Sequence, residues 1–302
     1  MKEQVPEQWS TLTTIFCIAQ VAKGLGKDSL YLKYIQRSNN WKNLWKSISH
    51  LGSTGFVMPR KSNGQWDNHY KDGSYTYNYI LKKFEEDDHF NTLSYGTWPD
   101  FFYEGRAWEY SLYVPQDVEG LIKMSGGKEA FEKRLDTYFG NGFYNVINEP
   151  SFFTPCLYTY IGKSWKTNDI IRSVVKKKYS DTRGGLPGND DAGSMSAWFI
   201  FNTIGFFPNA GQDIYIITAP AYDEVIMKLS DSKKLIIKTI NLSEKNKYIS
   251  SVKLNGKILN RAWLTHHEII EGGIIEFKMS SIPGQGGQKL PPPSSTVPYS
   301  NK

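Results

Sequence analysis

The spacing of apolar residues changes at Pro208, and this change constrains the fold more than any other feature. Before Pro208, apolar residues recur about every three or four positions, which is typical of amphipathic helices. After it they form short runs at regular intervals, which is typical of strands. With 302 residues, 39% of them apolar, the chain can bury the core of one large domain or two ordinary ones. The sequence therefore predicts a helical domain over residues 1–208 followed by a β domain.

The helical part is interrupted by loops rich in glycine, proline and asparagine. Residues 55–66 and 91–102 are predicted to be long loops, and binding sites are often built on such loops above a helical scaffold. We expect helices over residues 13–25, 29–44, 104–113, 118–124, 128–139, 153–160, 168–178 and 194–204.

The C-terminal part is predicted to be a small β-sandwich over residues 209–282. The pair Asn255 and Gly256 indicates a tight hairpin turn. Residues 283–302 are rich in Pro, Gly and Ser and are expected to form a disordered tail, because they cannot bury enough apolar surface. We expect strands over residues 214–218, 224–228, 234–239, 251–254 and 273–277.

The composition excludes several classes of protein. The formal charge of +6 is spread along the chain, and no basic stripe interleaves with aromatic residues, so nucleic-acid binding is not expected. The two cysteines, Cys17 and Cys156, exclude a disulfide framework. No apolar run reaches the roughly 18 residues that a membrane span needs. Residues 1–9 are polar and lack the features of a secretory signal.

Glu104 stands between an aromatic-rich loop and the glycine that opens a predicted helix. A carboxyl group among aromatic rings is desolvated, and desolvation raises its pKa toward the range that a general acid needs. The alternative is that Glu104 only interacts with the helix N-terminus. The residue pattern alone leaves both readings open.

Asn148 and Glu149 lie side by side directly before Pro150, whose ring fixes the local backbone. Both side chains carry oxygen atoms of the kind that hard cations such as calcium take as ligands. The pair could therefore supply two ligands to a metal ion. The simpler alternative is a solvated start of a helix.

Residues 184–198 combine glycines, a proline and two adjacent carboxylates before an amphipathic helix. Neighbouring carboxylates repel each other, so Asp190 and Asp191 need a cation, hydrogen-bond donors or a role as a base. An N-cap on the helix that begins near Ser194 would explain one of them. The second carboxylate remains available for chemistry.

These three segments, in this order and spacing, resemble the signature of glycoside hydrolase family 92. The family pattern Glu-Gly-Asn-Ala-Trp-Gln-Tyr, followed by Val-Pro-His-Asp, is similar to residues 104–110 and 114–117. Its Asn-Glu-Pro segment and the Tyr-Gly-Pro-Trp-Lys-Thr-like stretch after it are similar to residues 148–150 and 160–167. Its patterns Gly-Asn-Asp-Asp-x-Gly-x-Met-Ser-Ala-Trp and Leu/Ile-Gly-Phe-Tyr-Pro are similar to residues 188–198 and 204–208.

The resemblance implies a mainly α fold, in which a partial (α/α)6 barrel is followed by the C-terminal β-sandwich. It also implies a bound Ca2+ ion and inverting, exo-acting hydrolysis of terminal α-linked mannose, with α-1,2 as the expected linkage. A mannose-containing glycan would be the substrate. By analogy with the family, the protein would be secreted or periplasmic.

The resemblance also assigns roles to individual residues. Glu104 would be the general acid and Asp191 the general base, with Asp190 beside it; the chemistry of the residues does not by itself separate the two aspartates. Asn148 and Glu149 would hold the calcium ion. The sugar-contacting residues would be Trp108, Asn189 and Phe153.

The sequence also departs from the family pattern. Arg106 stands where the family has Asn, and Phe153 where many members have His, so the substrate preference is open. The N-terminal β-sandwich and the first helices of the barrel are not found, which suggests that the chain is a fragment of a longer enzyme. Two alternatives follow: a carbohydrate-binding remnant without turnover, or a related enzyme for another glycan or a mannosyl phosphate. Retention of Glu104 argues against the phosphate, whose departure needs no acid.

Overall fold

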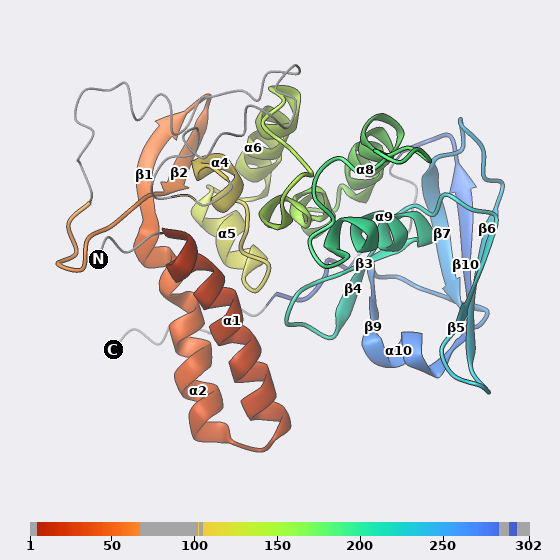
Figure 1. Cartoon of the computed structure of the whole chain (residues 1–302), viewed down its shortest axis with the longest axis horizontal. Coiled ribbons are helices and arrows are strands. Elements are labelled where there is room, and N and C mark those ends of the chain that lie inside the picture. Colours follow the sequence, from red (N-terminus) through yellow and green to blue (C-terminus); the bar gives the residue numbers. More distant parts are fainter. Residues whose placement is uncertain (1–4, 67–101, 103–104, 284–289, 295–302) are drawn as a thin grey trace. The chain divides into compact units, whose positions relative to one another are not determined.

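The computed structural model describes residues 5–66, 102, 105–283 and 290–294, with the side chains of residues 5–11 left aside. The chain forms two compact units, residues 1–154 with 294–302 and residues 155–293 (Figure 1). This division lies inside the predicted helical domain, because helix α9 packs against the strands that follow it.

The N-terminal unit contains five described helices, three short 3-10 segments at or before its end, and one β-hairpin. Its helices are α1 (Val5–Gly24), α2 (Asp28–Arg37), α4 (Ala107–Tyr110), α5 (Val118–Met124) and α6 (Lys128–Gly140). Its 3-10 segments are η1 (Ser38–Leu44), η2 (Glu149–Ser151) and η3 (Thr154–Cys156), and its strands are β1 (Trp45–His50) and β2 (Ser53–Val57).

Helices α1 and α2 form the antiparallel hairpin that the sequence predicts (Figure 1). Phe16, Ala19 and Ile35 form its buried core. The second helix is shorter than predicted, because the side chains of Ser38 and Asn39 both bond to the carbonyl of Ile35, at 2.7 and 3.1 Å. Side chains that take over a helical carbonyl in this way end the α-helix. The chain continues as the 3-10 segment η1.

The hairpin β1–β2 was not predicted, since residues 55–66 were expected to be a loop. Trp45 pairs with Val57, so the second strand includes the first residues of that segment. Gly55 has a φ of 88°, and an added Cβ would lie 2.2 Å from the indole nitrogen of Trp45. Gly55, which indicated a loop in the sequence, is instead required because the Trp45 ring lies directly against the strand at this position.

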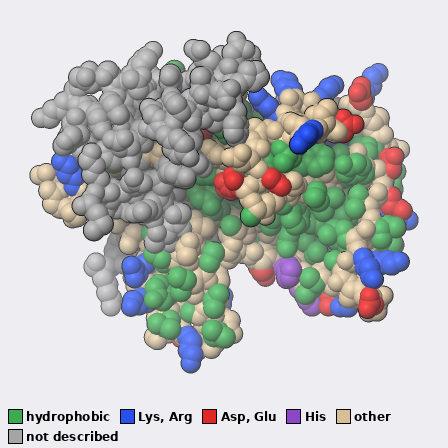
Figure 2. Space-filling model, in the orientation of Figure 1, with side chains coloured by type: hydrophobic (Ala, Val, Ile, Leu, Met, Phe, Trp, Pro, Cys, Tyr) green, Lys and Arg blue, Asp and Glu red, His purple; other side chains and the backbone are tan. Residues whose placement is uncertain are grey.

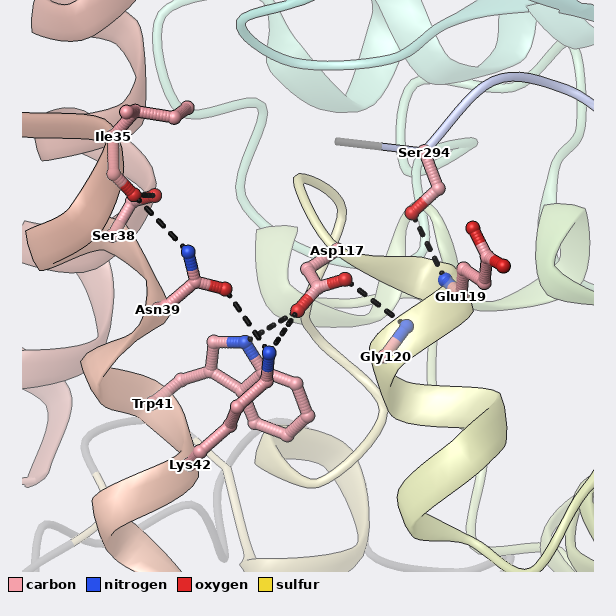
Figure 3. A network of polar contacts seen from close by, with 9 residues as sticks. All are labelled: Ile35, Ser38, Asn39, Trp41, Lys42, Asp117, Glu119, Gly120 and Ser294. Atoms are coloured by element: carbon pink, nitrogen blue, oxygen red, sulfur yellow. Dashed lines mark hydrogen bonds and ion pairs between the residues drawn. The ribbon is translucent and has the colours of Figure 1, made fainter. Parts of the chain in front are cut away.

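The buried carboxylate of Asp117 joins the η1 segment to helix α5 (Figure 3). Its Oδ2 accepts a hydrogen bond from Trp41 Nε1 at 3.2 Å and lies 3.0 Å from Lys42 Nζ. Its Oδ1 accepts the main-chain N–H of Gly120 at 3.0 Å, which caps α5. A Cβ at position 120 would meet the carboxylate at 2.3 Å, so this close contact requires glycine.

The C-terminal unit contains two β-sheets that share one core, as the predicted strands indicated. The five-stranded sheet has the order β5-β6-β10-β7-β8, with β10 parallel to β6, and the three-stranded sheet has the order β3-β4-β9. The strands are β3 (Phe206–Pro208), β4 (Ile214–Ile217), β5 (Glu224–Lys228), β6 (Lys234–Ile240), β7 (Tyr248–Leu254), β8 (Lys257–Ile258), β9 (Trp263–Thr265) and β10 (Gly273–Ser280).

Four helices accompany these sheets: α7 (Leu157–Tyr160), α8 (Ser164–Lys178), α9 (Ser194–Ile204) and α10 (His266–Glu271). Ile204 and Phe201 of α9 pack into the core shared by the sheets, together with Phe206, Leu235 and Phe277. Burial of these apolar side chains explains why α9 belongs to this unit. The predicted (α/α)6 barrel stays a prediction.

Part of the predicted disordered tail is ordered. Leu290 forms a parallel bridge with Arg261, and its N–H donates to the carbonyl of Asn260 at 3.1 Å. Ser294 Oγ accepts the main-chain N–H of Glu119 at 2.9 Å. The prediction of disorder is therefore wrong for residues 290–294. Residues 284–289 and 295–302 lie outside the described part of the chain.

Helix α1 carries apolar side chains on two faces. Ile18, Val21 and Leu25 are exposed on the side away from the core of the hairpin. Apolar side chains on the α1–α2 hairpin are visible in Figure 2. No described helix is long and apolar enough to cross a membrane. An apolar stripe of this kind is typical of a surface that packs against other protein.

Asp117→Asn tests the contribution of the buried carboxylate. We expect the free energy of unfolding to fall by about 3 kcal/mol, because the change removes the negative charge beside Lys42 and leaves an amide NH2 among the donors that surround this buried site. Urea denaturation would measure it. The control is Glu119→Gln, an exposed carboxylate on the same helix, which should change stability by less than about 0.5 kcal/mol. Equal small effects would contradict the role of Asp117.

Candidate active site

The predicted acid, Glu104, lies outside the described residues, but the helix that follows it is described. Helix α4 is shorter than the predicted helix over residues 104–113. It ends at Tyr110, where the next main-chain N–H groups bond three residues back instead of four: Leu112 donates to the carbonyl of Glu109 at 3.0 Å and Tyr113 to that of Tyr110 at 3.3 Å. Phe102 stacks on Tyr110 with ring centroids 5.4 Å apart. A Cβ at Gly105 would lie 2.8 Å from the Tyr110 ring, so only glycine fits there.

Glu109 is a buried carboxyl group on α4 that the sequence reasoning missed. It is 4% exposed, and burial raises its pKa to about 7, although the charge and main-chain N–H of Arg106 oppose the rise. Arg106 is the N-cap of α4, so Glu109 stands where a carboxylate commonly receives the N–H of that position. The signal was available, because the family pattern has neutral Asn and Gln at positions 106 and 109, where this sequence has the charged pair.

Trp108, predicted to contact the sugar, is 2% exposed. Its Nε1 donates to Nδ1 of His50 at 3.1 Å, and its ring meets those of Phe56 and Phe143 at centroid distances of 4.9 and 5.4 Å. The observed burial favours a packing role over contact with a sugar. Phe153, 6% exposed, is also buried, and the same interpretation applies to it.

Asn148 and Glu149, the predicted calcium ligands, lie at the start of η2. Asn148 has extended backbone and is half-buried, and its carbonyl accepts the N–H of Ser151 at 3.1 Å. Glu149 is exposed. Burial raises the pKa of the Tyr113 hydroxyl, and electrostatic repulsion from Cys17 and Glu149 raises this pKa further. Glu149 therefore interacts electrostatically with Tyr113.

The donor chemistry of this pair suits calcium, since both residues offer hard oxygen atoms. Two side chains do not complete a calcium shell of about six to eight oxygens, so main-chain carbonyls, water or sugar hydroxyls would have to supply the rest. Within the described ranges, no group of three or more His, Cys, Asp and Glu residues is placed to hold a metal ion. The calcium site therefore stays a prediction.

Asp190 is committed to the N-terminus of helix α9. Its Oδ1 accepts the N–H of Ser196 at 2.9 Å. Its main-chain carbonyl accepts the N–H groups of Gly193 and Met195, at 3.0 and 3.2 Å. Burial raises the pKa of the Tyr179 hydroxyl, and the charge of Asp190 raises it further. The N-cap position itself is Gly193, and Asp190 satisfies an N–H of the first turn from three residues before it, which is the structural role that the capping alternative gave to one of the two aspartates.

Asp191 is held in a different way. Its φ of 41° is followed by 55° at Ala192 and 90° at Gly193, so three consecutive residues are left-handed. Two of them are not glycine, and such backbone is costly outside glycine. The side chain is exposed, and among the described residues no donor pairs with its carboxylate. The turn presents a carboxylate that has no structural hydrogen bond to make.

The remaining predicted site residue, Asn189, is exposed on the same loop. The loop depends on Gly185, where a Cβ would lie 1.9 Å from the carbonyl oxygen of Ser180. Tyr179 stacks on Trp198 of α9, with centroids 5.6 Å apart and planes 6° from parallel. These contacts hold the loop from both ends. Asn189 to Asp191 therefore project from a supported turn.

The comparison with protein families finds one matching model. The Glycosyl hydrolase family 92 catalytic domain matches residues 2–281. The chain is 33% identical over 290 residues to an uncharacterized secreted glycosidase of Arthroderma benhamiae. The aligned region covers 92% of this chain and 36% of that protein.

Solved structures of two family GH92 mannosidases from Bacteroides thetaiotaomicron are also similar. The family GH92 α-mannosidase BT3965 has 32% identity and a TM-score of 0.79, and its complex with mannoimidazole has a TM-score of 0.81. The inverting mannosidase BT2199 has 28% identity and a TM-score of 0.75. The matches cover 94 to 96% of this chain but only 36 to 38% of those chains. The chain thus spans little more than a third of the length of the relatives it matches.

The two aspartates should respond differently when stability is measured. Asp190→Ala should lower the free energy of unfolding by about 1 kcal/mol, because it removes the helix cap. Asp191→Asn should change it by less than about 0.5 kcal/mol, since asparagine tolerates left-handed backbone and no hydrogen bond is broken. Thermal and urea unfolding would measure both. A larger loss at Asp191 would contradict the separation of roles.

Glu109→Gln should make stability less dependent on pH. The folded pKa of about 7 lies above the ordinary 4.5, so the stability that protonated Glu109 contributes is complete below pH 4.5 and is lost as the pH rises through about 7. Relative to wild type, the Gln variant should therefore gain about 3 kcal/mol between pH 4.5 and about pH 8. Urea titrations at several pH values would test this. Parallel pH curves for the two proteins would show that Glu109 is not shifted.

Proposed function

Because the chain belongs to glycoside hydrolase family 92, we propose that it is part of an inverting, exo-acting α-mannosidase that removes terminal α-linked mannose, with α-1,2 as the linkage. The family match over nearly the whole chain carries this proposal. One of the similar solved structures is described as an inverting mannosidase, and another is an α-mannosidase solved with mannoimidazole. These similarities support mannose in a glycan as the substrate.

In the proposed reaction, Glu104 protonates the departing glycosidic oxygen. Asp191 removes a proton from the water that attacks the anomeric carbon from the opposite face. Inversion needs room for this water, so the two carboxyl groups are expected to lie roughly 6.5 to 9.5 Å apart. Products are a sugar of inverted configuration and the free alcohol.

The choice of Asp191 over Asp190 rests on their different surroundings. A general base must be free to accept a proton from water, and the Asp190 carboxylate already accepts a main-chain N–H. Both side chains are exposed, but Asp191 has left-handed backbone, and among the described residues no donor pairs with its carboxylate. Strain of this kind is maintained where it positions a side chain for function. The adjacent pair thus divides into a supporting and a reacting group.

A calcium ion is the proposed cofactor, with Asn148 and Glu149 among its ligands. When bound, the ion would supply a hard Lewis acid that binds sugar hydroxyls. The two residues would provide a side-chain amide oxygen and a carboxylate, from a segment that Pro150 stiffens. We also propose a secreted or periplasmic location, which the description of the Arthroderma benhamiae relative as secreted supports.

Leaving-group chemistry separates the two carboxyl roles. Glu104→Gln should lower the rate on a mannoside with a poor alcohol leaving group by about 10²-fold or more, because no acid remains. A mannoside with an activated phenolate, which departs without protonation, should lose much less. Asp191→Asn should slow both substrates, since both need the attacking water.

These rates are best measured after the wild type is shown to be active, in the full-length protein. Asp190→Asn is the matched control, because the asparagine oxygen can still accept the N–H of Ser196. This variant tests whether the loss of a negative charge anywhere in the pair is sufficient to lower the rate. Equal losses of Glu104→Gln on both substrates, or near-normal turnover of Asp191→Asn, would contradict the assignment.

Removal of calcium should lower both thermal stability and activity. A ligand that binds only the folded protein stabilises it by mass action. Adding calcium back should restore the melting temperature, and magnesium should restore it poorly, because magnesium demands a tighter octahedral shell. Asn148→Ala should weaken the response to calcium. A melting temperature that is the same with chelator and with calcium would remove the metal from the proposal.

A further inference from the structure

Arg134, on helix α6, is a fully buried cation without a carboxylate partner among the described residues. It is 1% exposed, and burial lowers its pKa to about 9. A buried charge of this kind is costly unless its surroundings compensate it. Arginine at this position therefore indicates a geometric requirement that an apolar side chain would not meet.

The surroundings of Arg134 form a box of aromatic rings and main-chain carbonyls. Its Nη1 donates to the carbonyl of Gly55 at 2.7 Å, and the carbonyl of Thr54 lies 3.3 Å away. The guanidinium carbon lies 4.4 Å from the ring centroid of Phe56, 5.2 Å from that of Trp45 and 5.3 Å from that of Trp108. A flat cation attracts ring faces in this range, more strongly when water is excluded.

Three separate elements meet in this box. Trp45 and Phe56 come from the hairpin β1–β2, Trp108 from α4 and Arg134 from α6. Gly55 allows the box to close, since any side chain there would overlap the Trp45 indole. The guanidinium thus joins three elements: the hairpin β1–β2, α4 and α6.

Helix α4 depends on such contacts for its position. It has four residues, and a helix this short has little stability of its own. Trp108, its second residue, is held by Arg134 on one side and by the hydrogen bond to His50 Nδ1 at 3.1 Å. Contacts of the Trp108 ring with α6 and with the hairpin therefore set the position of α4.

We propose that Arg134 is a positioning residue, which acts through the Trp108 ring to fix α4, the helix that begins three residues after Glu104, the acid of the proposed reaction. Its effect on catalysis rests on the proposed function, whereas its effect on α4 does not. The planar cation is required because it meets three rings and a carbonyl at the same time. Lysine keeps the charge but lacks the plane that lies against the rings.

The test compares Arg134→Lys with Leu135→Ala in the full-length protein. Leu135 is fully buried on the same helix, about 100° around its axis, so its loss destabilises the core without removing the cation. Both variants are assayed on the poor and the activated leaving groups. Hydrogen exchange of the main-chain amides of residues 107–112 is measured in parallel.

We expect Arg134→Lys to lower kcat on the poor leaving group by about tenfold or more, with KM little changed, because a displaced acid is inefficient. The activated substrate should lose less than about threefold. Exchange at residues 107–112 should accelerate. Leu135→Ala should lower both rates by the same factor, with no selective change in α4.

If Arg134→Lys does not fold, the second variant is Trp108→Phe, which removes the hydrogen bond to His50 and reduces the ring system beside Arg134, and it should lower the rate on the poor leaving group more than on the activated one. Equal losses on both substrates together with unchanged exchange in α4 would overturn the proposal. If the wild type hydrolyses neither substrate, the proposed function fails, and the exchange measurement still decides whether Arg134 fixes α4.

Discussion

The N-terminal unit depends on the compensation of buried charge, and the carboxylate of Asp117 is its main example. A buried carboxylate is stable only when hydrogen-bond donors surround it, and a buried cation only when acceptors or ring faces do. Here Trp41, Lys42 and Gly120 do so, and they come from η1 and α5. The helical hairpin and the later helices are therefore joined through one group. Arg134 is the cationic counterpart: its Nη1 donates to main-chain carbonyls and its guanidinium lies over aromatic rings, while Nε and Nη2 are buried with no hydrogen-bond partner among the described residues.

The loop before α9 shows how one short segment gives different properties to two neighbouring carboxylates. Asp190 folds back onto the helix and satisfies its first turn, so its charge supports structure. The left-handed residues that follow turn the chain away, and Asp191 points its carboxylate to solvent without a partner among the described residues. The strain of this turn is compensated by the cap beside it and by the stacking of Tyr179 on Trp198. Asp190 thus has the structural role, and the next residue, Asp191, has the proposed chemical role.

Sequence reasoning succeeded where local patterns decide the structure. The hairpin α1–α2, helix α9 and the C-terminal strands follow from periodicity and from glycines at element ends, which act over a few residues. It failed at β2, because Gly55 indicated a loop and only the ring of Trp45 explains the glycine. It failed at Leu290, whose partners lie near Arg261, far away in the chain. It did not foresee that Trp108 is buried.

The sequence by itself determined the family, the three chemistry-bearing segments and the residue types available there, because these depend on order and spacing along the chain. It could not separate Asp190 from Asp191, nor show that Glu109 and Arg134 are buried. Those properties depend on which groups surround a side chain in space. Hydrogen-bond partners, burial and the resulting pKa are set by residues distant in sequence, so only the tertiary structure decided them.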